Sequence, residues 1–140
     1  MTDERAELYK LLNKPRGLRW KIRNNLTKIE ELSGMLTGGS VTDYDRISVK
    51  TSPSNRMEDI LVKIADIEEE NTALKKELAD IEQRLTEAFA ALRGKHGAVL
   101  KMVYLDNMTY AQIAKTLEMS EAGVYKIRRL ALDEVQYIVL

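Results

Sequence analysis

The chain has 140 residues, with 22 basic and 22 acidic side chains, one histidine and no cysteine. This length fits one domain or two small ones. The absence of cysteine excludes disulfides, thiolate zinc sites and cysteine nucleophiles, and a single histidine argues against multi-histidine metal sites.

The composition, 44% hydrophobic and 31% charged with only two prolines, is typical of a helix-rich protein. Its apolar runs are too short to cross a bilayer, and no apolar core of a signal peptide follows the charged start, Met1–Arg5. We therefore expect a cytoplasmic, all-α protein that needs no membrane, metal or cofactor.

The first segment, residues 1–36, carries apolar side chains at three- and four-residue steps, which predicts a helix that buries one face. Pro15 and Gly17 interrupt the stripe, so we expect a short helix before Asn13 and a longer one from about Arg16. The stripe comprises Leu8, Leu11, Leu18, Ile22, Ile29, Leu32 and Leu36.

The next segment, residues 37–55, is rich in Gly, Ser, Thr and Asp and is predicted to be a linker or long loop. Its Arg46–Lys50 piece is compatible with a short strand.

Residues 56–93 form the clearest pattern in the sequence, an unbroken heptad spacing that predicts a long coiled-coil helix. Asn55 and Glu58 are spaced as a capping box that would open it. Such a seam needs a partner helix. The residues expected to mediate oligomerisation are Ile60, Ile64, Ile67, Asn71, Leu74, Leu78, Ile81 and Leu85.

The partner helix has two possible sources. A parallel homodimer would set Asn71 against its own copy, which favours two strands in register. An antiparallel hairpin with residues 16–36 would bury both stripes within one chain, and hairpins that dimerise would combine the two. Ten acidic and four basic residues lie in 57–92, so the hairpin would also neutralise the basic run Lys14–Lys28, where Trp20 is expected to pack.

Residues 93–97 contain Gly94 and Gly97, which predict the end of the long helix, with His96 as a hinge or surface residue. After this break, residues 98–140 are predicted to form a trihelical helix-turn-helix module. Its buried side is expected to comprise Val99, Leu100, Val103, Tyr104, Ile113, Ala114, Leu117, Val124, Ile127 and Ala131.

Tight turns should separate these three helices. Asn107 can adopt the left-handed conformation in the first turn, and Thr109 with Gln112 forms a capping box for the second helix. Glu118 turns the chain again, and Ser120 caps the third helix.

The third helix is expected to present a basic outer face that fits the major groove of B-DNA. Arginine, lysine and tyrosine there offer donors to phosphates and bases, and the start of the second helix is a usual phosphate-contact position. The predicted DNA-contacting residues are Thr109, Tyr110, Ser120, Glu121, Ala122, Tyr125, Lys126, Arg128 and Arg129.

The stretch AVLKMVYLDNMTYAQIAKTLEMSEAGVYKIRRLALDEV, residues 98–135, resembles region 4 of bacterial sigma factors. With RGLRWKI (16–22), GGS (38–40) and VKIADIEEE (62–70), the chain is similar over most of its length to phage, prophage and mobile-element proteins that carry such a module. Glycine is common in those proteins where this chain has Asn107 and Glu118, and threonine is usual at Gly123. The resemblance implies a transcription regulator of phage late or mobile-element genes.

Three functions are therefore weighed. The first is a regulator that binds double-stranded DNA as a homodimer or higher homo-oligomer. The second is a sigma-like adaptor that also binds RNA polymerase, using the apolar segment Val135–Leu140. The third is a structural coiled-coil protein that binds neither. The carboxylates of 58–82 repeat along the solvated face of a heptad helix, and no base, nucleophile and oxyanion donor converge at any readable spacing, so an enzyme is not expected.

Overall fold

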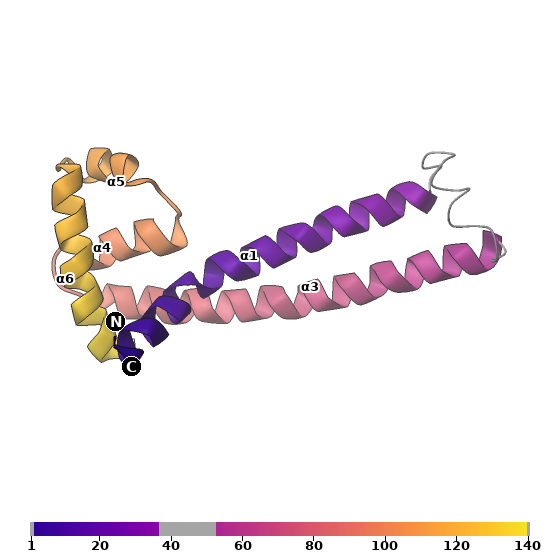
Figure 1. Cartoon of the computed structure of the whole chain (residues 1–140), viewed down its shortest axis with the longest axis horizontal. Helices are drawn as coiled ribbons and strands as arrows, with labels where there is room; N and C mark the ends of the chain where they lie inside the picture. Colours follow the sequence, from indigo (N-terminus) through magenta and orange to yellow (C-terminus); the bar gives the residue numbers. More distant parts are fainter. Residues whose placement is uncertain (1, 37–52, 140) are drawn as a thin grey trace. The chain divides into compact units, whose positions relative to one another are not determined.

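The computed structural model describes residues 2–36 and 53–139, and within these ranges the ordered elements are helices without a strand (Figure 1). They are α1 (Asp3–Leu36), α3 (Pro53–Ala90), α4 (His96–Leu100), the π-helix η1 (Lys101–Leu105), α5 (Tyr110–Leu117) and α6 (Glu121–Val139). The predicted all-α fold is confirmed. The possible strand at 46–50 lies outside the described residues.

Two of the predicted helix boundaries are wrong. α1 is a single helix that continues through Pro15, and α3 begins at Pro53, so Asn55 lies inside the helix and is not its N-cap. Proline has no backbone N–H, so one hydrogen bond of the helix is missing at Pro15. The Pro15 ring is fully buried, and this burial offsets part of the free energy that the missing hydrogen bond costs.

The chain divides into two compact units, Leu18–Glu77 and a second unit made of Met1–Gly17 with Leu78–Leu140. This differs from the predicted division, in which residues 98–140 stand alone as a module. Apolar side chains explain the second unit, because Leu8, Leu12 and Leu85 are completely buried in it.

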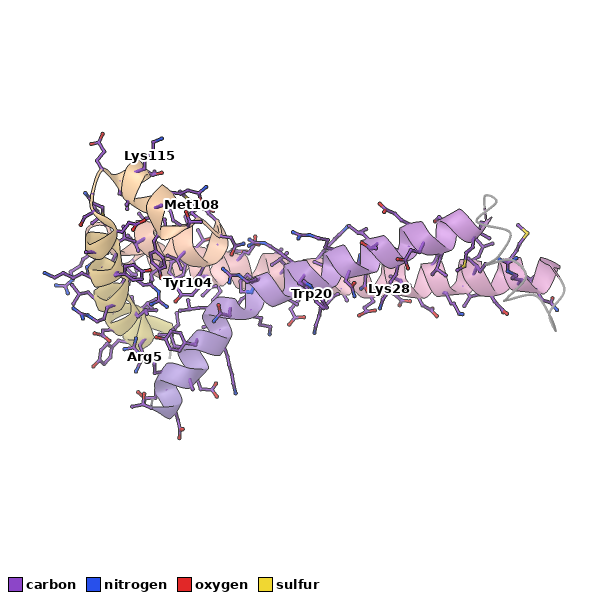
Figure 2. All side chains as sticks on the ribbon, turned by 45° about the horizontal axis from the view of Figure 1, so that its top comes forward. Arg5, Trp20, Lys28, Tyr104, Met108 and Lys115 are labelled. Atoms are coloured by element: carbon purple, nitrogen blue, oxygen red, sulfur yellow. The ribbon has the colours of Figure 1, made fainter. Side chains whose placement is uncertain are left out.

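The first unit is an antiparallel hairpin in which residues 18–36 of α1 and 53–77 of α3 lie side by side (Figures 1 and 2). Leu18 and Ile60 are buried, and the amides of Asn25 and Asn71 are hydrogen-bonded to each other at 2.8 Å. Of the arrangements left open by the sequence, the structure shows the hairpin within one chain. The expectation that Trp20 packs is wrong, since its side chain is 63% exposed.

In the second unit, α4, η1, α5 and α6 surround a common core (Figure 1). Val99, Ile113, Ala114 and Val124 are buried at its centre, as the sequence predicts. Packed against them are the partly buried Met102, Val103, Met108, Tyr110, Leu117, Met119 and Ile127.

The end of the long helix and the start of α4 depend on two glycines, Gly94 and Gly97. Gly94 has a φ of +50°, and a Cβ on Gly97 would lie 2.1 Å from the carbonyl oxygen of Phe89, far inside van der Waals contact. Glycine adopts the positive φ at position 94 without strain, and at position 97 it avoids a collision with the backbone of Phe89, so the long helix ends here and the chain turns into α4.

The C-terminal half of α6 is tied to two other parts of its unit. Arg5 forms an ion pair with Asp133, and Gln136 donates a 3.1 Å hydrogen bond to Glu4. Glu134 accepts hydrogen bonds from the backbone and side chain of Arg93 and lies 3.0 Å from Nδ1 of His96. These contacts hold α6 to the start of α1 and to the break after α3.

Among the described helices, none is both long enough and apolar enough to span a bilayer.

Candidate nucleic-acid interface

Capping fixes the start of α5 and the three-residue turn that joins α5 to α6. Thr109 Oγ1 accepts a hydrogen bond from the Gln112 backbone at 3.2 Å, and the Gln112 side chain accepts one from the Thr109 backbone at 2.9 Å. Glu118 ends α5 with a φ of +53°, and Ser120 Oγ accepts from the Gly123 N–H at 3.0 Å. The predicted capping box and turn are confirmed.

The exposed face of α6 carries most of the side chains predicted to contact DNA. Glu121 and Ala122 lie exposed in the first turn, followed by Tyr125, Lys126 and Arg129. Neither Lys126 nor Arg129 has a hydrogen-bond or ion-pair partner in the described part of the chain. Two positive charges are therefore available on this face for an anionic ligand.

Two aromatic rings link this face to the start of α5. Tyr110 and Tyr125 are stacked with their ring centroids 4.1 Å apart and their planes inclined by 21°. Tyr125 remains 54% exposed, whereas Tyr110 is half-buried. Stacking restricts the rotamers of Tyr125, which lowers the entropic cost of binding a ligand through this side chain.

Arg128 differs from its neighbours because it does not point outward as expected. It is half-buried, its Nη2 donates a 2.7 Å hydrogen bond to the Tyr104 hydroxyl, and its Nε is buried without a partner. Burial raises the pKa of the Tyr104 phenol, and the Arg128 charge beside it opposes this shift only in part. Arg128 therefore joins α6 to η1, and the helical period alone did not reveal this contact.

Local packing constrains Gly123, in the first turn of α6. A Cβ at this position would lie 3.0 Å from Cε of Met119 and 3.2 Å from Oγ of Ser120. A larger side chain would therefore crowd the hydroxyl that caps α6.

The structure adds a residue of α1 that the sequence did not place near this interface. Arg16 was expected to face the acidic helix of the hairpin, but it binds Asn107, in the turn before α5. Asn107 has the predicted left-handed conformation, with a φ of +53°. Because residues 16 and 107 are 91 positions apart, no local pattern could have revealed the contact.

The predicted oligomerisation residues are largely covered within a single chain. Asn71 and Ile60 are buried in the hairpin unit, and Ile81 and Leu85 are buried in the other unit. The remaining four, Ile64, Ile67, Leu74 and Leu78, are half-buried. Asn71 bonds to Asn25 of its own chain, so the arrangement in which it meets its own copy is not the one observed.

The described residues thus define an all-helical protein with a capped two-helix motif and an exposed basic face. Residues 36–136 match the family model described as "Protein of unknown function (DUF1492)", and the chain belongs to this family. No curated protein and no solved structure matches the chain significantly. The matched range begins at the last residue of α1.

Proposed function

We propose that this protein is a transcription regulator that binds double-stranded DNA, with α6 in the major groove and the start of α5 on the sugar-phosphate backbone. The observation that carries this proposal is the exposed α6 face, on which Lys126 and Arg129 are unneutralised and Tyr125 is held by stacking. Helix-turn-helix proteins bind in this way, and phosphate contacts supply much of their affinity.

The resemblance of residues 98–135 to sigma region 4 supports the same role and favours genes of phages or mobile elements as targets. Contacts of α6 with base edges would come from its first two turns, where Glu121, Ala122 and Tyr125 lie exposed. Ser120 and Thr109 act first as helix caps, and their hydroxyls can contact phosphates only in addition to that role.

The decisive experiment compares two double substitutions that remove the same charge. Lys126→Ala/Arg129→Ala should weaken binding to a duplex at least tenfold and lower the salt dependence, because each lost phosphate contact reduces the slope of log affinity against log salt by ~0.9. Lys75→Ala/Lys76→Ala removes two exposed lysines from α3 and should bind as the wild type does. Equal affinities of the two variants in a fluorescence anisotropy titration would reject the proposal.

A second candidate function, a sigma-like adaptor for RNA polymerase, is favoured by the end of α6. Val135 is buried as part of the helix's inner face, but Tyr137 is 88% exposed and Leu130 and Ile138 are also exposed. An apolar surface of this kind can bind a protein. Retention of RNA polymerase by the wild type and its loss in Tyr137→Ala would support the adaptor; the absence of retention would leave DNA binding alone.

Self-association is proposed as well, since tethering two DNA-binding units makes the second contact intramolecular. The measurement is the mass of the protein in solution, with and without a random-sequence duplex. A monomer under both conditions would exclude the dimer, and a dimer without affinity for DNA at low salt would instead indicate a structural coiled-coil protein.

A further inference from the structure

Arg16, near the middle of α1, is immobilised although it is exposed. Its Nε and Nη2 both donate to Oδ1 of Asn107, at 3.2 and 3.0 Å. Asn107 precedes the N-cap of α5, Thr109, by two residues, and both contacts lie within one compact unit. The guanidinium is therefore held beside the turn that leads into the proposed DNA interface.

No carboxylate neutralises this guanidinium within the described residues. Its acceptor is a neutral amide, and the neighbouring Asp106 pairs with Lys101 at 3.6 Å. The first turn of α5 contains no acidic residue, and the N-terminus of a helix is the positive end of its dipole, so the start of α5 does not neutralise the arginine either. An exposed cation that is fixed in place and lacks a counter-charge is suited to bind an anion.

The position of Arg16 is continuous with the proposed interface. Asn107 leads to Thr109 and Tyr110 at the start of α5, and Tyr110 stacks on Tyr125 of α6. A duplex that contacts Tyr125 and the start of α5 would bring backbone phosphates to this same edge, because the first helix of such a motif crosses the backbone.

We propose that Arg16 is a further phosphate-contacting residue of the DNA interface, supplied by α1 and positioned by Asn107. The inference rests on the proposed function, and it extends the interface beyond residues 36–136, which match the family model. Docking of the first part of α1 onto this unit then contributes to affinity for DNA as well as to stability.

The test measures the salt dependence of duplex binding for Arg16→Gln, with Arg23→Gln as the matched control on the exposed surface of the hairpin. Arg16→Gln should weaken binding several-fold and reduce the slope of log affinity against log salt by ~0.9, the loss of one phosphate contact. Arg16→Lys should retain the slope, and Arg23→Gln should match the wild type. Equal slopes for Arg16→Gln and Arg23→Gln would overturn the inference.

A second variant separates the charge of Arg16 from its positioning. Asn107→Gly keeps the left-handed backbone accessible and every charge in place but removes the amide that holds the guanidinium. Asn107→Gly should weaken DNA binding, but it should change the slope of log affinity against log salt less than Arg16→Gln does. An unchanged affinity would exclude the positioning role of Asn107. If Lys126→Ala/Arg129→Ala binds DNA as tightly as the wild type does, the proposed function is wrong. If Lys126→Ala/Arg129→Ala loses binding but Arg16→Gln does not, only the inference about Arg16 is wrong.

Discussion

Asn25 donates a 2.8 Å hydrogen bond from its side-chain amide to Oδ1 of Asn71, and both residues are buried between α1 and α3. Asn71 in turn donates to the carbonyl of Ile22 at 3.3 Å. Burying an amide without a hydrogen-bond partner lowers the stability of the fold, and any slip of one helix along the other would leave both amides buried and unpaired. The pair therefore fixes the register of the hairpin.

Replacing one member of this pair should cost more than replacing both. Asn71→Leu leaves the Asn25 amide buried without its partner and should reduce the free energy of unfolding by about 1–3 kcal/mol. Asn25→Leu/Asn71→Leu removes both polar groups and should recover most of that loss. Urea unfolding of the two single variants and the double variant measures the coupling, and strictly additive losses would contradict the pairing.

The first part of α1 should contribute strongly to stability. Leu12 is completely buried, so Leu12→Ala should reduce the free energy of unfolding by about 2–5 kcal/mol. Leu26→Ala makes the same change on the same helix at a side chain that is 46% exposed, and it should shift stability by less than about 0.5 kcal/mol. Thermal melts compare the two, and equal shifts would show that residues 3–17 are not docked.

Tyr104 should ionise at a higher pH than an unburied tyrosine does. Its folded-state pKa is raised above the ordinary value of 10.0 by burial, so this group destabilises the fold only as pH rises above 10.0 and has no effect below it. A pH titration followed by tyrosinate absorbance should show a component that ionises above pH 10.0. Tyr104→Phe should remove this component, and Tyr137→Phe should not. A component of this kind that persists in Tyr104→Phe would assign the shift to another residue.

Glu134 should stabilise the protein at neutral pH but not in acid. Desolvation tends to raise its pKa, but hydrogen bonds from the Arg93 backbone, His96 and the Arg93 side chain outweigh it, so the pKa lies below the ordinary 4.5. The contribution to stability is therefore complete above pH 4.5 and is lost as pH falls through the folded-state pKa. Glu134→Gln should lower the melting temperature at neutral pH and flatten its decline in acid, whereas Glu69→Gln, on an exposed position of α3, should do neither.

Local patterns predicted the parts of the fold that local physics controls. The heptad spacing indicated α3 because a helix repeats its faces at a fixed period, and Thr109 with Gln112 located the start of α5 because capping needs only neighbouring residues. The inward faces of α5 and α6 followed from the same period, as the buried Ile113 and Val124 show.

Contacts between distant segments could not be predicted in this way. Pro15 was expected to break α1, but its cost depends on burial that the sequence does not reveal. Arg128 was placed on the outer face by its position along the helix, and only the folded chain brings its long side chain to Tyr104. The packing of residues 3–17 with residues 78–140 likewise depends on tertiary contacts rather than on periodicity.

The unit that joins residues 1–17 to residues 78–140 has a consequence for how the protein is made. During synthesis the ribosome releases Leu8 and Leu12 well before Val135, and all three are buried in this unit, so the unit cannot finish packing until α6 has been made. The hairpin unit, residues 18–77, lies between these segments in the sequence and can form before α6 has been made. A nascent chain that stalls before α6 would thus leave the apolar side chains of Leu8 and Leu12 exposed to solvent. Such stalled chains would be substrates for chaperones.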